Sequence, residues 1–171
     1  MGEATERYAA DLGLAREPQD AFSAQSHERA AKAQKDGLLA DEIVPVSIPQ
    51  RRGESIQLTD DEGIRSDVDA ASLARLRAAF VADGNITAGN ASGINDGTAI
   101  LLLANDAARV AHDLESRARI IGVVTVGCEP ARFGLGPVGA VQSLCEQAGW
   151  NLAGVDTDEI NEAFAVQTLV C

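Results

Sequence analysis

The chain has 171 residues, of which 46% are apolar and 4% aromatic, so it is long enough and apolar enough to bury a core. This composition excludes a chain that is disordered throughout. The formal net charge of −12 excludes nucleic-acid binding through a basic patch, because so acidic a surface repels phosphate backbones.

The first predicted element is a helix over residues 17–35, where apolar residues recur at roughly helical spacing with charge on the other side. Pro18 falls in its first turn, where the missing N–H costs little. Gly37 follows the last periodic residue and is expected to stop the helix.

Residues 42–46 are expected to form a short strand. Residues 49–68 are polar and rich in charge, which indicates a surface segment with one further short strand at 55–58. Asp69 is expected to cap a helix that runs to Phe80.

In the second half of the chain, short apolar runs alternate with predicted helices. Residues 99–104 are a short apolar run, after which Asn105 is expected to cap a helix. Residues 120–126 are rich in β-branched side chains and almost wholly apolar, which predicts a central buried strand.

A helix is expected to begin at Pro137 and to end at Gly149. A short strand is predicted near 159–160, and a last helix is predicted to start near Glu162 and to be still running at Cys171. Such alternation of strands and helices predicts a layered α/β fold. A chain that stops within its last helix would leave a sheet with few strands and an uncovered edge. We therefore expect the sequence to be part of a longer one.

Residues 85–97 form the most unusual segment, with three glycines, three asparagines, one serine and one aspartate. Small side chains let a ligand lie against the main chain, and Ser92 offers a hydrogen bond without bulk. The segment is either a binding loop or a tight set of turns. Its glycines are spaced by four, which does not match the dinucleotide pattern GxGxxG.

A second polar segment, residues 161–165, stands where a strand is predicted to pass into a helix. Sites in α/β sheets gather at the carboxyl ends of strands. Asn161 could orient a water or donate to an oxyanion there, or it could simply cap the helix.

The cysteines Cys128, Cys145 and Cys171 show no paired spacing, and His27 and His112 form no metal-ligand pattern with them. We therefore expect no metal site and no disulfide. Cys145 is expected in the core and Cys128 in a structural role, and neither has a His nearby in sequence.

No segment has the length and apolarity of a membrane span or a signal peptide, and an odd number of thiols fits a reducing compartment. We expect a soluble, cytoplasmic protein with no membrane and no nucleic-acid partner. An anionic ligand would need a local cationic site, for which the candidates are Arg51, Arg52 and Arg65.

The two unusual segments together resemble the thiolases, the family of acetyl-CoA acetyltransferases and 3-ketoacyl-CoA thiolases. Residues 87–97 read TAGNASGINDG and residues 161–164 read NEAF, and both closely match hallmarks of that family. The opening dipeptide and residues 41–46 and 134–137 match in the same order, so the resemblance covers the whole chain.

The resemblance implies a partial thiolase-like α/β fold, layered as αβα. Residues 1–90 would be part of the loop domain, and residues 91–171 the first half of the C-terminal domain. It implies an acyltransferase that condenses two acyl-CoA molecules or cleaves a 3-ketoacyl-CoA through an acyl-cysteine. CoA would be a substrate, with no metal and no covalently bound cofactor. Thiolases of full length are usually homodimers or homotetramers.

The resemblance also implies roles for individual residues. Asn161 would fix a water that helps to form an oxyanion hole. Ser92 would hydrogen-bond the pantetheine arm of CoA with Ala88 beside it, and Arg65 and Ser72 would lie near the adenine nucleotide. The remaining CoA-contacting residues would be Met1, Phe80, Ile94, Ala163 and Phe164.

The catalytic motifs of the family do not occur in this sequence: the nucleophilic Cys, the His of an HPxG-type motif and the Cys of a CxGGG-type motif. None of the three cysteines aligns with a catalytic one. We therefore expect the chain to be inactive alone. The alternatives are a non-catalytic acyl-CoA binding or interaction module, or a truncated product without function.

Overall fold

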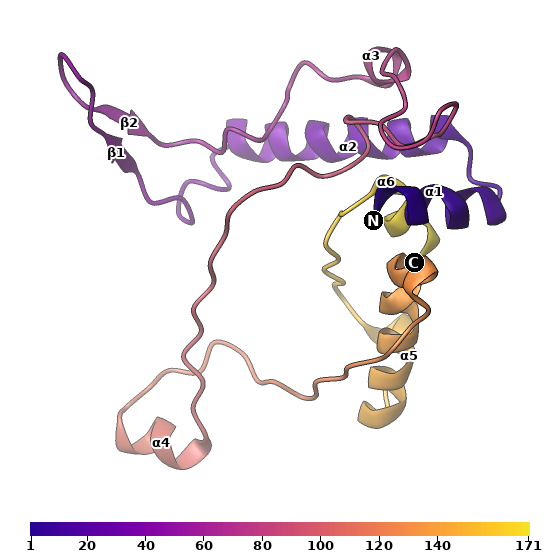
Figure 1. Cartoon of the computed structure of the whole chain (residues 1–171). Helices are drawn as coiled ribbons and strands as arrows, with labels where there is room; N and C mark the ends of the chain where they lie inside the picture. The colour runs from indigo at the N-terminus through magenta and orange to yellow at the C-terminus, as the bar shows by residue number, and fades with distance from the viewer.

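The computed structural model describes residues 1–171, and Figure 1 shows a cluster of helices from which two longer excursions leave. The elements are α1 (Gly2–Asp11), α2 (Arg16–Lys35), β1 (Val46–Ile48), β2 (Ile56–Leu58), α3 (Ala70–Ala74), α4 (Asp106–Ala111), η1 (Pro130–Leu135), α5 (Gly136–Ala148), η2 (Leu152–Gly154) and α6 (Ala165–Val170).

The longest helix, α2, confirms the predicted helix over residues 17–35 almost to the residue. Gly37 has a φ of +74°, which suits a residue just past a helix end. α2 packs against α3 and α6, so it is the element around which the motif segments gather. Helix α1 precedes it and was not predicted from the sequence.

The hairpin of β1 and β2 lies beyond the C-terminal end of α2 (Figure 1). Its strands are antiparallel, with Val46 opposite Leu58 and Ile48 opposite Ile56. The second predicted strand is confirmed, whereas the first begins at Val46, where the segment 42–46 was predicted to end. The shift has a physical reason, because Pro45 has no N–H to give to a ladder.

Helix α3 is shorter than predicted. Asp69 caps it in a capping box with Ser72, as expected, but the helix ends at Ala74 instead of reaching Phe80. The chain turns back instead, and the Ala79 N–H donates to the Ile86 carbonyl oxygen at 2.8 Å. The pairing of Ala79 with Ile86 therefore ends the helical pattern that the local sequence favours.

The core lies where α1, α6 and the segment around Ile86 meet. It consists of Tyr8, Ala9, Ile86, Phe164 and Val166, all at most 7% exposed. The Tyr8 ring packs edge-on against another aromatic ring, with centroids 6.4 Å apart. Because the two motif segments each contribute a core residue, the core itself fixes them beside one another.

The predicted boundaries of α4 and α5 are largely confirmed. The Asn105 side chain accepts the Ala108 N–H at the start of α4, although the helix buries none of its residues. α5 carries Pro137 in its first turn, and Gly149 ends it with a φ of +68°. Both observations follow from local chemistry that the sequence displays.

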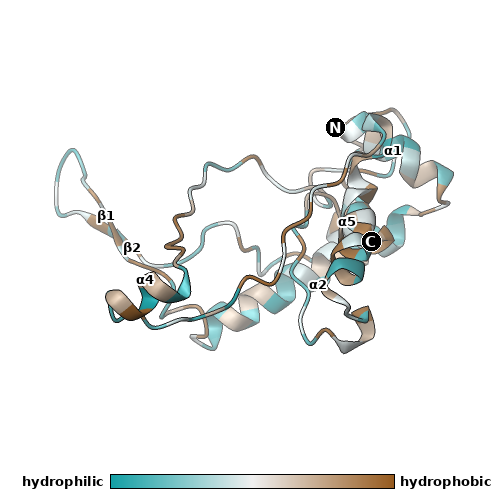
Figure 2. Ribbon diagram, turned by 90° about the horizontal axis from the view of Figure 1, so that it is seen from below, coloured by the Kyte–Doolittle hydropathy of each residue, from teal (hydrophilic) through white to brown (hydrophobic).

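The predicted buried strand at 120–126 is wrong for this structure. The segment is extended without ladder partners, and Val123 is 81% exposed. The segments 99–104 and 159–160 likewise form no strand. A strand requires a neighbour to take its N–H and C=O groups, and no segment of these 171 residues pairs with them in a ladder. Figure 2 shows brown, apolar stretches along the extended connections near α4.

Candidate functional site

The two unusual sequence segments meet in the structure. Ala91 and Phe164 form an antiparallel bridge. The Ser92 N–H donates to the Ala163 carbonyl oxygen at 3.0 Å, and the Ala165 N–H donates to the Asn90 carbonyl oxygen at 2.9 Å. Residues about 70 positions apart in the sequence are therefore held in one short ladder.

The segment 85–92 is a set of turns tied by its own side chains. The Asn90 Oδ1 accepts the Thr87 N–H at 2.8 Å, and the Thr87 Oγ1 accepts the Gly89 N–H at 3.1 Å. Gly89 packs so closely on Leu73 and Leu76 that a Cβ there would overlap both side chains. The turn interpretation is thus confirmed, and the turns leave Ala88 and Ser92 exposed.

A buried carboxylate anchors the start of this segment. The Glu6 side chain on α1 accepts the N–H groups of Asn85 and Ile86 at 3.0 and 2.8 Å. Glu6 is only 8% exposed, and two N–H donors compensate part of the cost of burying its charge. Nothing in the sequence around Glu6 indicated this role.

A hollow of about 290 Å³ opens between α2 and this ladder. Of the predicted site residues it brings together Ser92, Ala88 and Arg65. Two hydrogen bonds close its sides: Ser26 donates to the Glu162 carboxylate at 2.7 Å, and the His27 Nδ1 accepts the Arg65 N–H at 3.3 Å. The other lining residues are Phe22, Ser23, Gly63, Gly89, Asn90, Ala91, Gly93 and Ala165.

An aromatic pair lies on the other side of the ladder. Phe80 and Phe164 pack edge to face, with centroids 6.2 Å apart. Phe80 is 44% exposed and also covers Gly2, where a Cβ would overlap its ring. Met1 directly precedes Gly2 and is exposed, so Met1 and Phe80 present apolar surface here, whereas Phe164 is buried beneath Phe80. Ala163 is half-buried beside them.

The structure does not bring all the predicted site residues together. Ile94 is fully exposed and lies past the ladder. Ser72 is engaged in the capping box of α3, where its backbone N–H donates to the Asp69 carboxylate at 2.7 Å. That bond holds the pKa of Asp69 below its usual value of 3.8.

Asn161 does not cap the last helix. α6 begins at Ala165, after an N-cap at Phe164 that makes no side-chain cap bond. The Asn161 side chain is exposed and hydrogen-bonds to no other group of the chain, and its carbonyl oxygen accepts the Ala163 N–H at 2.9 Å. The helix-cap interpretation is therefore wrong, and the amide is available to a ligand.

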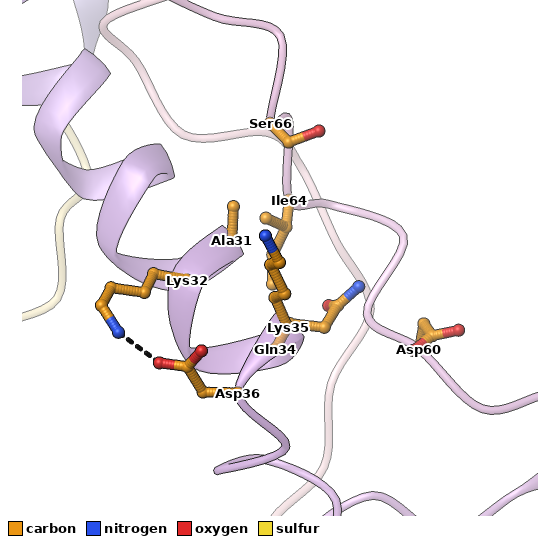
Figure 3. A pocket seen from close by; sticks show the side chains of 8 residues that line it. All are labelled: Ala31, Lys32, Gln34, Lys35, Asp36, Asp60, Ile64 and Ser66. Carbon is orange, nitrogen blue, oxygen red and sulfur yellow. Dashed lines mark hydrogen bonds and ion pairs between the residues drawn. The ribbon is translucent and has the colours of Figure 1, made fainter.

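A larger hollow of about 700 Å³ lies near the C-terminal end of α2 (Figure 3). It contains none of the predicted site residues, although two lysines line it. Lys32 is ion-paired with Asp36, as Figure 3 shows. We place the candidate site in the smaller hollow, because three predicted site residues line it and none lines the larger one. Asn161 lines neither hollow.

The cysteines do not join the site. Cys128 and Cys171 are exposed, Cys145 is half-buried on α5, and none lines the smaller hollow. The expectation of a core position for Cys145 is therefore met only in part. The structure holds no cluster of three or more His, Cys, Asp or Glu side chains that could bind a metal. None of its helices combines the length and apolarity needed to cross a membrane.

Comparison with known proteins identifies the class of fold and site. The family model described as "Thiolase, N-terminal domain" matches residues 1–107, and "Thiolase, C-terminal domain" matches residues 114–171. The chain is 50% identical over 169 residues to the acetyl-CoA acetyltransferase of Chromobacterium violaceum, which covers 99% of this chain and 43% of that protein. It is 45% identical over 171 residues to a beta-ketoadipyl-CoA thiolase of Acinetobacter baylyi, covering 43% of that protein.

Solved structures of similar fold belong to the same family. The acetyl-CoA acetyltransferase of Bacillus anthracis superposes with a TM-score of 0.91 at 41% identity, over 99% of this chain and 43% of that one. The dimeric peroxisomal thiolase of Saccharomyces cerevisiae gives 0.89 at 41% identity, over 100% of this chain and 42% of that one. The chain belongs to the thiolase family of acyltransferases.

These matches confirm the predicted α/β fold class, a partial thiolase-like fold. The chain spans about 43% of the length of the curated relatives that it matches. The division into domains at residues 90 and 91 stays a prediction.

Proposed function

We propose that this chain supplies one wall of the CoA site of an acyltransferase of the acetyl-CoA acetyltransferase type. The observation that carries the proposal is the ladder between Ser92 and Ala163. It fixes the segment that carries the exposed Ser92 hydroxyl beside the segment that carries the Phe164 ring and the unengaged Asn161 amide. Such a mix of apolar walls and a few polar groups suits a long, flexible ligand arm.

The proposed roles follow from the chemistry of each side chain. Ser92 donates to or accepts from the amides of the pantetheine arm, and Ala88 leaves room for it. Arg65 and Ser72 serve the nucleotide end, where the cation offsets the acidic surface of the chain. The apolar walls of the arm are Met1, Phe80, Ile94, Ala163 and Phe164.

Asn161 is proposed to orient a water toward the thioester oxygen of the substrate. A neutral amide can donate to developing negative charge without trapping it, and the Asn161 backbone is held where its carbonyl oxygen accepts the Ala163 N–H at 2.9 Å. The reaction itself would transfer an acyl group between CoA thiols through an acyl-cysteine. That cysteine is not proposed among Cys128, Cys145 and Cys171, because none of them lines the hollow.

We infer that the chain does not complete this reaction alone. The purified 171-residue chain is expected to show no thiolysis of acetoacetyl-CoA. The matching experiment grafts the chain into the Chromobacterium violaceum acetyltransferase in place of the aligned 43% of that protein. This grafted enzyme is expected to catalyse thiolysis. Turnover by the chain alone, or an inactive but folded graft, would contradict the proposal.

The Ser92 assignment is tested in the grafted enzyme. Ser92→Trp fills the hollow and is expected to weaken CoA binding by at least about tenfold, which is ~1.4 kcal/mol. Ser55→Trp, on the exposed hairpin, is the matched control. Equal affinity of the two variants for CoA, measured by calorimetry, would remove Ser92 from the site.

A second candidate is a non-catalytic acyl-CoA binding module, which the position of the cysteines outside the hollow favours. A binding module has no use for an oxyanion residue. If the chain alone binds CoA and an Asn161→Ala graft keeps its full kcat, the binding module becomes the better description.

A further inference from the structure

The Asp20 carboxylate is buried near the N-terminal end of α2 and has no part in the function proposed above. It is 2% exposed, yet it is not isolated. The Arg16 Nε donates to one of its oxygens at 2.7 Å, and the Asn90 Nδ2 donates to the other at 3.0 Å. A buried charge persists only with such partners, so its position is strongly determined.

Asn90 links Asp20 to the candidate site. Its side chain accepts the Thr87 N–H at 2.8 Å and donates to the Asn85 carbonyl oxygen at 3.0 Å. Its carbonyl oxygen accepts the Ala165 N–H at 2.9 Å. One residue therefore connects α2, the turns that present Ser92, and the segment that follows Asn161.

Arg16 provides a second connection. Its Nη2 donates to the carbonyl oxygens of Leu73 and Leu76 at 2.6 and 3.2 Å, at the C-terminal end of α3. The side chains of these two leucines are the surface on which Gly89 packs. The turns are thus located by Asp20 through Asn90 and by Arg16 through the leucines.

We propose that Asp20 is a positioning residue, which acts through Asn90 to set the spacing between Ser92 and Asn161. This rests on the proposed function, in which one group holds the CoA arm and the other faces the thioester oxygen. With the carboxylate neutralised, Asn90 loses its charged acceptor, and its side chain is then held only by the Thr87 N–H and the Asn85 carbonyl oxygen. Misplacement of a binding group by about 1 Å can reduce catalysis about 100-fold.

The test uses Asp20→Asn in the grafted enzyme. We expect kcat for thiolysis to fall by about tenfold or more and KM for CoA to rise, because both groups shift relative to one another. The double variant Asp20→Asn with Asn90→Asp exchanges amide and carboxylate and keeps the bonds between residues 20 and 90 and from Arg16, but it loses the donation from residue 90 to the Asn85 carbonyl oxygen. It is therefore expected to recover part of the loss in kcat.

Gly149→Ala is the control for a merely structural role, since Gly149 ends α5 with a φ of +68°, where a Cβ is strained, and shares no hydrogen bond with this network. It is expected to lower the melting temperature while leaving kcat and KM for CoA unchanged. If Asp20→Asn lowers the melting temperature in the same way without changing kcat, or if the double variant recovers nothing, the positioning role is overturned.

A second measurement keeps this inference separate from the proposed function. Amide hydrogen exchange on the graft reports whether the N–H groups of Thr87 and Ala165 lose protection in Asp20→Asn and regain it in the double variant. An inactive unmodified graft would count against the proposed function alone. Unchanged protection of Thr87 and Ala165 would overturn the positioning role whatever the activity.

Discussion

The Ser92 N–H donates to the carbonyl oxygen of Ala163 at 3.0 Å, although the two residues stand about 70 positions apart. This bond, with that from Ala165 to Asn90, turns two polar segments into one surface. Neither segment alone amounts to a site, because only the ladder brings Ser92 and Ala163 together. Their joint edge presents a hydroxyl, an amide and an aromatic wall within one region.

Asn161→Ala in the grafted enzyme tests the oxyanion role. We expect kcat to fall by about 10²–10³-fold, as when other preorganised oxyanion donors are removed, with a smaller change in KM for CoA. Asn151→Ala is the matched control, because that side chain only caps η2 by accepting the Ala153 N–H at 3.0 Å. Steady-state thiolysis assays check the prediction, and a loss of similar size in both variants would contradict it.

Gly89→Ala tests the packing of the turns on α3. Because a Cβ would overlap Leu73 and Leu76, we expect the free energy of unfolding to fall by about 1–3 kcal/mol. Gly97→Ala belongs to the same segment but has open space around it, so it is expected to change stability by less than about 0.5 kcal/mol. Urea denaturation of the two variants makes the comparison. Equal stabilities would show that Gly89 is not needed for close approach.

Local chemistry made part of this fold predictable. The stop at Gly37, the caps at Asp69 and Asn105 and the end of α5 at Gly149 each depend on residues within one turn, and the structure confirms them. The strand at 120–126 depends instead on a neighbour. An apolar, β-branched run favours a strand but cannot supply the ladder partner. The strand predicted at 120–126 is therefore wrong for this structure.

The candidate site likewise combines features that the local sequence indicates with contacts between distant residues. Its unusual composition singled out Ser92 and Asn161, and the resemblance assigned them roles. The residues that support them could not be predicted from the sequence, because Glu6 and Ser26 hydrogen-bond to residues 80 and 136 positions away. Only the spacing of Arg16 and Asp20 by four gave a local signal, since such pairs commonly form ion pairs on helices.

Tyr8 predicts an alkaline limit to stability. Burial disfavours the phenolate and raises the pKa of Tyr8 above its ordinary value of 10.0. The folded state thus favours the neutral phenol, so this contribution is complete below pH 10.0 and is lost as the pH rises through the folded pKa. Tyr8→Phe should remove that alkaline loss. It should change the melting temperature little at pH 7, because the hydroxyl has no hydrogen-bond partner. Melting curves between pH 7 and 11 test both statements, and an alkaline loss that persists in Tyr8→Phe would contradict the assignment.

The apolar side chains of the extended segments predict the behaviour of the isolated chain. Leu101 and Leu102 are 82% and 83% exposed, and Ile121 is 56% exposed, which is unusual for large aliphatic side chains in continuous runs. We expect the chain alone to bind the dye ANS and to self-associate. Leu102→Ser with Ile121→Ser should reduce both effects, whereas Val44→Ser, which changes an exposed side chain outside these two segments, should not.

In the grafted enzyme the same two segments would have polypeptide beside them. There we expect little ANS fluorescence, and the double serine variant should now destabilise the fold by roughly 2–5 kcal/mol, as polar substitutions and lost methyl groups do in a core. Dye binding and urea denaturation of chain and graft make the comparison. Serine variants that leave the graft as stable as before would mean that these segments stay exposed in a complete thiolase as well.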